Sequence, residues 1–141
     1  MSKGNTFEND ILLLIFNATT INDLAENDTT TPATSLTVAL HTADPGEAGT
    51  QLTSETAYTG YARQTVARTS SGWTVTTNSV SPVANIDFPE CTASPGGAIT
   101  FFSVGTGVSN KLLYSGTVTP NITMAVGVIP RLKTTSTITE D

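Results

Sequence analysis

From residue 35 onward the sequence alternates repeatedly between apolar and polar residues, and this two-residue period constrains the fold more than any other feature. In the segment SLTVALHT, Leu36, Val38 and Leu40 fall on one face of an extended chain. Such alternation is typical of a strand with one buried face. Seven more short segments follow, each bounded by Gly, Pro, Asn or Ser: YTGYARQTVAR, GWTVTT, ANIDF, AITFFSV, KLLYSGTV, TMAVGVI and RLKTTSTI.

Short strands at this spacing, without helical patterns between them, predict an antiparallel all-β fold. Residue usage agrees, because about one residue in five is threonine, which suits pleated, half-exposed surfaces. We expect a β-sandwich of jelly-roll type with about eight strands. A chain of 141 residues with 38% hydrophobic residues fits a single globular domain. Within it we expect an N-terminal helix and polar loop over residues 1–34 and the sandwich over residues 35–141.

Residues 6–17 have a helical rather than a two-residue period. Thr6 can cap the start of a helix, and Glu8 and Asp10 then lie in its first turn, where the helix dipole favours acidic side chains. The apolar residues at helical spacing either cover one end of the β core or dock on a neighbouring subunit. The candidate interface residues of this stripe are Phe7, Ile11, Leu14 and Ile15.

Charge and cysteine content exclude several classes of protein. A net charge of −6 argues against nucleic acid as a partner, because affinity for phosphate backbones comes mostly from Lys and Arg. The single cysteine, Cys91, cannot form an internal disulfide, which disfavours a stapled secreted module. The apolar run ILLLIF is too short to span a bilayer and follows acidic residues, so we predict neither a membrane segment nor a signal peptide.

The only histidine, His41, stands at the end of a predicted strand, without a companion that would make it a catalyst. A zinc site needs further Cys or His ligands at close spacing, and Cys91 has none. A Ser-His-Asp arrangement through Asp44 has no supporting GxSxG motif. We expect His41 to hydrogen-bond a loop carbonyl or Asp44. We therefore predict that the protein is not an enzyme and holds no cofactor or metal.

Two weaker alternatives stay open at the level of sequence. The acidic stretch at residues 23–28 offers oxygen ligands for calcium but lacks the spacing of an EF-hand. Flat aromatic side chains form sugar-stacking platforms in some sandwiches, although a β core and its rim would use about as many aromatic residues. The side chains concerned are Trp73, Tyr58, Tyr61 and Tyr114.

The stretch HTADPGEAGTQLTSETAYTGYARQTVAR, residues 41–68, is the most distinctive of the chain. Its DPGE segment predicts a turn, because Pro45 presets φ at the second position and Gly46 tolerates positive φ at the third. Arg63 and Arg68 lie on opposite faces of a predicted strand, which favours separate ion pairs or interface contacts. The candidate interface residues of this stretch are His41, Asp44, Tyr58, Tyr61 and Arg63.

The blocks LHTADPG and YTGYAR, followed by GWT, IDFPECT and LLYSG, resemble a family of small tailed-bacteriophage virion proteins labelled tail fibre or capsid decoration (cement) proteins. The resemblance covers most of the chain and implies a jelly-roll sandwich that binds other virion subunits and brings no catalytic residues. We expect a decoration protein on the outer surface of the capsid, bound to the major capsid protein and stabilising the shell. A tail or tail-fibre component and a carbohydrate-binding module are the alternatives. Because a small sandwich leaves sheet edges that a second copy can cover, we also expect a dimer or trimer.

Overall fold

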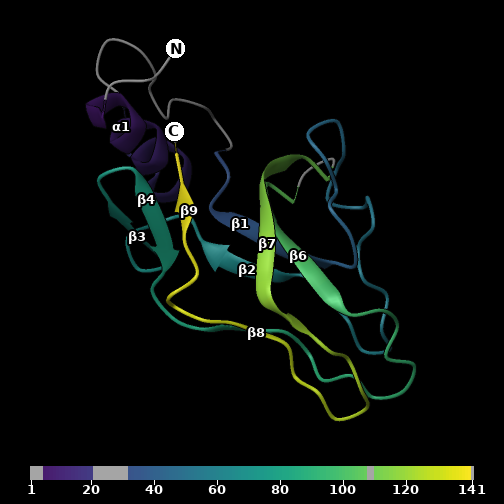
Figure 1. The fold of residues 1–141 in the computed structure, drawn as a ribbon. Coiled ribbons are helices and arrows are strands. Elements are labelled where there is room, and N and C mark those ends of the chain that lie inside the picture. Colours follow the sequence, from purple (N-terminus) through teal and green to yellow (C-terminus); the bar gives the residue numbers. More distant parts are fainter. Residues whose placement is uncertain (1–4, 21–31, 108–109, 141) are drawn as a thin grey trace. The chain divides into compact units, whose positions relative to one another are not determined.

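The computed structural model describes residues 5–20, 32–107 and 110–140, and most of its regular secondary structure is β strand (Figure 1). These residues form one helix, α1, and nine strands, so the prediction of an antiparallel all-β fold with one short N-terminal helix is confirmed. Their arrangement is consistent with a β-sandwich, and the jelly-roll order stays a prediction. The elements are α1 (Asn5–Asn17), β1 (Ser35–His41), β2 (Gln64–Ala67), β3 (Trp73–Thr76), β4 (Ser79–Pro82), β5 (Ile86–Asp87), β6 (Ile99–Gly105), β7 (Leu112–Ile122), β8 (Arg131–Leu132) and β9 (Ile138–Thr139).

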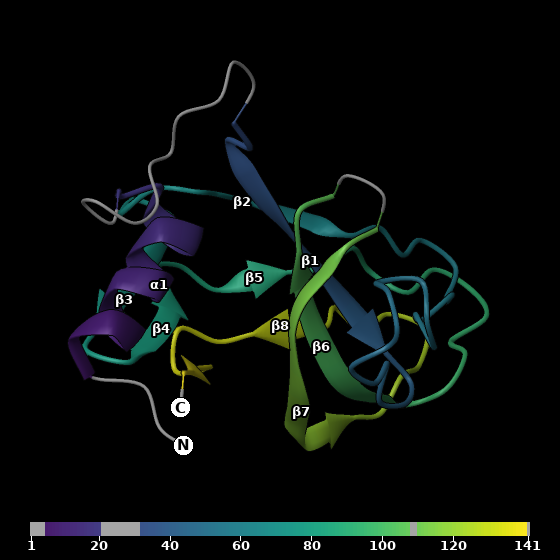
Figure 2. The same cartoon turned by 90° about the horizontal axis from the view of Figure 1, so that it is seen from above.

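The strands form three antiparallel sheets. The largest has the order β2-β1-β6-β7, the second has the order β3-β4-β9, and β5 pairs with β8. β1 pairs with β6 in an unbroken register, from Thr37 opposite Gly105 to His41 opposite Phe101. β7 lies beside β6 at one edge of the largest sheet, as Figure 2 shows.

The chain divides into two compact units that each combine distant parts of the sequence. Unit 1 takes its described residues from 1–36, 66–85 and 133–141, and unit 2 takes its described residues from 37–65 and 86–132. The helix therefore shares a unit with β3, β4 and β9 rather than standing apart from the strands.

In unit 1, α1 packs against β3 and β4 through one apolar face. Leu12 and Phe16 have no exposed surface. The Phe16 ring meets the Trp73 indole in a T-shaped contact with 4.9 Å between ring centroids. The helix thus belongs to the core of unit 1, and the face that enters this core is centred on Leu12 and Phe16 rather than on the predicted stripe.

The C-terminal end of α1 is held by an arginine from a distant segment. Ala18, the residue after the helix, has a left-handed backbone with φ of 54°. The Arg68 guanidinium donates hydrogen bonds to the carbonyls of Leu14 at 2.5 Å and Ile15 at 2.6 Å. A cation is favourable there because the last carbonyls of a helix lack backbone partners and carry partial negative charge.

The observed strands differ from the predicted ones at two places. Residues 123–129, predicted as a strand, contain a turn that is closed by a hydrogen bond of 3.1 Å from the Val128 N–H to the Ala125 carbonyl, and the Gly127 N–H within it donates to the Cys91 carbonyl at 2.8 Å. Gly127 has φ of 88°, a conformation that glycine adopts without steric cost and that does not occur in a regular strand. Conversely, the sequence does not predict β4, which pairs with β3 and β9.

Candidate interaction site

The loop that joins β1 to β2, residues 42–63, returns to the end of β1 and is tied to it. The Thr56 N–H donates to the Leu40 carbonyl at 2.9 Å. His41 and Glu55 form an isolated antiparallel β-bridge. The first part of the loop is therefore compact, because backbone hydrogen bonds tie Glu55 and Thr56 to the end of β1.

His41 lies wholly inside unit 2, with no exposed surface. Its Nδ1 atom is 2.9 Å from the Thr53 carbonyl oxygen, and its Nε2 atom is 2.8 Å from the Ser103 hydroxyl. Because a carbonyl only accepts hydrogen bonds, Nδ1 carries the hydrogen, and Nε2 accepts from Ser103 when the ring is neutral. Burial lowers the pKa of His41 from its ordinary value of 6.5, which favours the neutral ring. The prediction that His41 binds a loop carbonyl is confirmed.

Gln51 connects the loop to β1 and β6 through its buried side-chain amide. Its Nε2 atom donates to the Thr37 carbonyl at 3.1 Å and to the Ser103 hydroxyl at 3.3 Å. Its Oε1 atom accepts from the Thr37 hydroxyl at 2.8 Å. Since Ser103 accepts from Gln51, the Ser103 hydrogen is directed toward His41, in agreement with the tautomer assigned above. Sequence reasoning missed Gln51, because no local motif marks a glutamine whose partners are distant in sequence.

Arg63 and Glu55 form the ion pair of this network. Two parallel hydrogen bonds of 2.7 Å join the guanidinium to the two carboxylate oxygens. Arg63 also donates to the Asn110 side chain at 2.8 Å. The Tyr61 hydroxyl donates to Glu55 at 2.8 Å and accepts from the Leu40 N–H at 3.1 Å. The hydrogen bonds that Arg63 donates to Glu55 raise the pKa of Arg63, and burial raises the pKa of Tyr61, so a cation and a neutral phenol surround this carboxylate.

Leu52 faces outward from this fixed loop and is 61% exposed. Its neighbours on either side are Gln51, whose amide is buried, and Thr53, whose carbonyl binds His41. The Leu52 carbonyl accepts from the Glu55 N–H at 3.4 Å. A side chain on such a backbone can bind a partner with little loss of conformational entropy. Leu52 and the surrounding loop therefore form the candidate interaction site.

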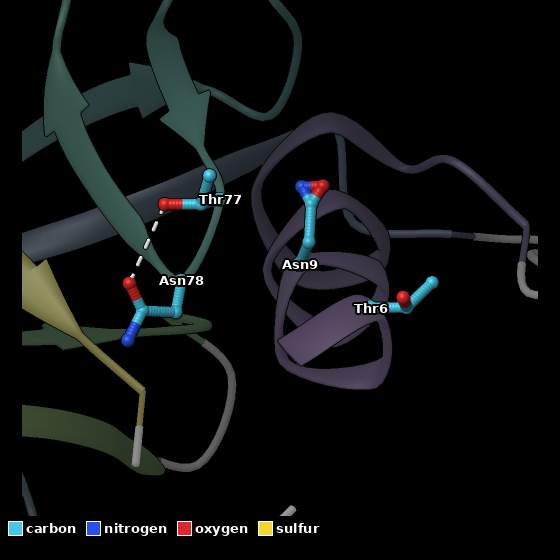
Figure 3. A pocket seen from close by; sticks show the side chains of 4 residues that line it. All are labelled: Thr6, Asn9, Thr77 and Asn78. Atoms are coloured by element: carbon cyan, nitrogen blue, oxygen red, sulfur yellow. Dashed lines mark hydrogen bonds between the residues drawn. The ribbon is translucent and has the colours of Figure 1, made fainter. Parts of the chain in front are cut away.

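A partly open pocket of about 520 Å³ lies in unit 1 (Figure 3). Thr6 and Asn9 line it from α1, and Thr77 and Asn78 line it from the turn between β3 and β4. The Asn78 side chain donates to the Glu140 carbonyl at 3.1 Å, which gives it a structural role. The described residues that line the pocket are threonines and asparagines, which offer hydroxyl and amide groups and carry no charge.

Comparison with known proteins identifies the family. The model of the podophage GP4 fiber I protein gp80 family matches residues 6–139. This chain belongs to that family. The resemblance to phage virion proteins indicated by LHTADPG and YTGYAR is confirmed, and a fibre protein is a structural component of the virion. No curated protein matches this chain.

The structure brings several predicted interface residues of this fibre-family protein into one network. His41, Tyr61 and Arg63 all belong to it, the last through hydrogen bonds to Glu55 and, at 3.4 Å, to Gln51. His41 is buried, so in this conformation it shapes the loop from inside and does not present its ring at the surface. Whether Tyr61 and Arg63, which are half-buried, contact a partner stays a prediction.

Two further predicted residues of this stretch lie outside the network. Tyr58 is 2% exposed and donates to the Pro89 carbonyl at 2.7 Å, and burial raises its pKa to about 12. Asp44 is exposed and accepts from the Gly46 N–H at 2.9 Å. Gly46 has φ of 70°, as predicted, but the hydrogen-bonded turn lies two residues further along than predicted, where the Gly49 N–H donates to the Gly46 carbonyl at 3.0 Å. Because Tyr58 and Trp73 are both buried, neither contributes to a sugar-stacking surface.

The four candidate residues of α1 do not form an exposed stripe among the described side chains. Ile11, Leu14 and Ile15 are half-buried, and the side chain of Phe7 lies outside the described part. The alternative that the helix is an arm separate from its own core is not what the structure shows, because α1 packs on β3 and β4. Contact of these residues with a neighbour stays a prediction.

The described part of the chain was also searched for groups of metal-binding side chains and for helices that could span a membrane. There, no group of three or more His, Cys, Asp or Glu side chains is placed to hold a metal ion. The acidic stretch 23–28, considered for calcium, lies outside the described residues. The described helix is neither long nor apolar enough to cross a membrane.

Proposed function

We propose that this protein is a non-catalytic building block of a podophage fibre and that the loop over residues 42–63 docks on another virion protein. The observation that carries the proposal is the family match over residues 6–139, which includes the whole loop. The polar network supports it, since buried hydrogen bonds fix the backbone around Leu52 before any partner arrives. A preformed surface of this kind is suited to assembly.

The chemistry of the network supports a structural role. An acid or base catalyst must reach a substrate proton. Both ring nitrogens of His41 are instead occupied by Thr53 and Ser103. The Arg63 guanidinium is engaged by Glu55 and Asn110. The polar groups of these side chains are therefore engaged in hydrogen bonds within the protein, and these bonds stabilise the conformation of the loop.

Capsid decoration is the second candidate. A chain that forms an extended shaft is expected to carry heptads or long repeats, and this sequence has neither. A small β protein without a shaft fits equally well on the outer surface of a shell, where it would clamp neighbouring copies of the major capsid protein. The negative net charge favours an exterior position over one against packaged DNA.

Locating the protein in intact virions separates the two candidates. Gold-labelled antibodies raised against the purified chain are expected to bind at the fibres or tail. Labelling spread over the shell, with a copy number proportional to that of the capsid protein, would establish decoration instead.

A charge at the candidate site tests the docking loop itself. Virions assembled with Leu52→Asp are expected to contain less of this protein than wild-type virions, as measured by quantitative mass spectrometry, because a carboxylate would be desolvated in the contact. Val83→Asp is the matched control, since Val83 is an exposed apolar residue of unit 1. Equal incorporation of the Leu52→Asp and wild-type chains would remove the loop from the proposal.

A further inference from the structure

A relay of hydrogen bonds runs beneath the loop over residues 42–63, and its donors and acceptors fix its direction. The Thr37 hydroxyl donates to the amide oxygen of Gln51, and the amide nitrogen of Gln51 donates to the Ser103 hydroxyl. Ser103 then donates to Nε2 of His41, and the Nδ1–H of His41 donates to the Thr53 carbonyl. The side chains in the middle of this relay have no exposed surface. Each group is therefore held in one hydrogen-bonding role.

A proton added to His41 conflicts with this relay. Nε2 would become a donor directed at Ser103, so the Ser103 hydroxyl could no longer donate to it. Ser103 can accept from both His41 and Gln51, but its own hydrogen would need a new acceptor. Among the described residues, the Ser103 hydroxyl forms hydrogen bonds only with these two side chains. A buried charge and a buried hydroxyl hydrogen without an acceptor both destabilise the closed loop.

The charged groups that act on the ring have opposing effects. Burial has the largest influence on the pKa of His41 and lowers it. The bond to the Thr53 carbonyl and the carboxylates of Glu55 and Asp44 raise this pKa, whereas the Arg63 guanidinium lowers it. Both oxygens of Glu55 are already bound by Arg63. The strands on either side of β1 add no ionisable side chain, because β2 (QTVA) and β6 (ITFFSVG) contain none.

Residues 51–54, here called the cover segment, lie between the His41 ring and solvent. The Thr53 carbonyl contacts the ring, whereas Leu52, Thr53 and Ser54 are exposed. Ser54 has a left-handed backbone with φ of 53°, which is unfavourable for a residue other than glycine. The relay therefore holds a strained segment closed. Opening of this segment would admit water to the ring while β1 stays paired with β6.

We propose that protonation of His41 opens the cover segment and thereby withdraws Leu52 from its docking position. The inference rests on the proposed docking function of this loop and adds its regulation: the surface is preformed near neutral pH and released in acid. The open segment binds a proton at His41 more readily than the closed one. The open population therefore rises as the pH falls below the ordinary pKa of 6.5, by at most about tenfold per pH unit.

Hydrogen exchange and NMR on the purified full chain test the opening. His41 is the only histidine, so its ring signals report its protonation without ambiguity. Two amides report on the cover segment: the Gln51 N–H donates to the Asn110 carbonyl, and the Thr42 N–H donates to the Ser54 carbonyl. Their protection, corrected for the intrinsic exchange rate at each pH, is expected to fall about tenfold between about pH 7.5 and about pH 5. The midpoint of this fall should follow the titration of the ring.

Two substitutions show whether this one proton is the cause. In His41→Asn the side chain does not titrate, so the protection of the two reporter amides is expected to be the same at both pH values. Glu47→Gln is the matched control, since it removes an exposed carboxylate of the same loop, and it is expected to respond to pH as wild type does. The Gly127 N–H, bound to the Cys91 carbonyl in the same unit, is the internal control and should stay protected throughout.

Reporter amides of the wild-type chain that stay equally protected at both pH values would overturn the proposal. An undiminished pH response in His41→Asn would overturn it as well. The wild-type measurement decides the question alone if the variant does not fold.

Release from virions separates this inference from the docking function. Virions washed at about pH 5 are expected to lose this protein, as measured by quantitative mass spectrometry, whereas virions washed at about pH 7.5 retain it. Retention at the lower pH by a chain whose cover segment opens in solution would contradict docking through Leu52 and leave the pH response established. Unchanged amide protection in solution would overturn the pH response whatever the virions retain.

Discussion

The interior of unit 1 and the interior of unit 2 are stabilised by different kinds of interaction. Unit 1 relies on apolar contacts, in which Phe16 of the helix packs against Trp73. Unit 2 adds a buried polar network that includes His41, Gln51 and Ser103. Apolar burial is non-directional, whereas each buried polar group needs a particular partner at a particular angle. A polar network therefore specifies one loop conformation, which is the property that an interaction site requires.

The aromatic residues allow the two units to be observed separately. The only tryptophan, Trp73, lies in unit 1, and the three tyrosines, Tyr58, Tyr61 and Tyr114, lie in unit 2. Tryptophan fluorescence therefore reports on unit 1. The near-ultraviolet circular dichroism of tyrosine reports mainly on unit 2. For a substitution in one unit, the two signals show whether the other unit is also destabilised.

Phe16→Ala is expected to have the largest effect, because it removes a fully buried ring from unit 1. The expected loss in the free energy of unfolding is about 3–5 kcal/mol. Denaturant titration followed by tryptophan fluorescence measures it. Ile11→Ala, at a half-buried position on the same helix, is the control and is expected to cost about 1 kcal/mol. Equal losses for the two variants would contradict the assignment of the core face of α1.

Gln51→Leu is expected to have the next largest effect, through unit 2. It leaves the Thr37 and Ser103 groups without their amide partner, and each unsatisfied buried group costs about 1–3 kcal/mol, so we expect a loss of about 2–4 kcal/mol. The tyrosine signal should weaken before the tryptophan signal during denaturation. Leu52→Ala, at the adjacent exposed position, is expected to change stability by less than about 0.5 kcal/mol. A stable Gln51→Leu protein would show that the network is dispensable.

The lowered pKa of His41 makes unit 2 sensitive to acid. The unfolded chain binds a proton at His41 more readily than the folded chain does. The stabilisation is therefore complete above the ordinary pKa of 6.5 and declines as the pH falls below it, by at most about 1.4 kcal/mol per pH unit.

Urea denaturation at about pH 7.5 and about pH 5 measures this dependence, and His41→Asn is expected to reduce it. Asp87 does not interfere in this range, because the hydrogen bond from Arg131 lowers its pKa below 3.8. An unchanged pH dependence in the variant would assign the effect to other groups.

Ala18→Gly is expected to have the smallest effect and the opposite sign. A left-handed backbone costs about 1–2 kcal/mol for residues other than glycine, and the greater freedom of unfolded glycine offsets part of this gain. We expect a net stabilisation of about 0.5–1 kcal/mol, measured by the midpoint of thermal unfolding. Ala84→Gly, at an exposed site in unit 1 without positive φ, is expected to be neutral or destabilising.

Sequence was sufficient where the cause of a structure is local. The alternation in SLTVALH predicts β1, and Gly46 has positive φ as expected, although the hydrogen-bonded turn spans residues 46–49 rather than 44–47. Sequence was insufficient where contacts between residues far apart in the chain determine the local structure. Arg68 caps carbonyls more than fifty residues earlier in the chain, and no pattern near Gln51 reveals its partners in β1 and β6. The segment TMAVGVI is apolar enough for a strand, but the turn at Gly127 prevents one.

The fixed backbone on either side of Leu52 limits how this surface can vary during evolution. The Leu52 side chain is exposed, so its replacement alters what a partner meets while the scaffold stays intact. An inserted residue would instead displace either the Gln51 amide from β1 and β6 or the Thr53 carbonyl from His41. Relatives that bind different partners should therefore differ in side-chain identity at this position and keep the same loop length.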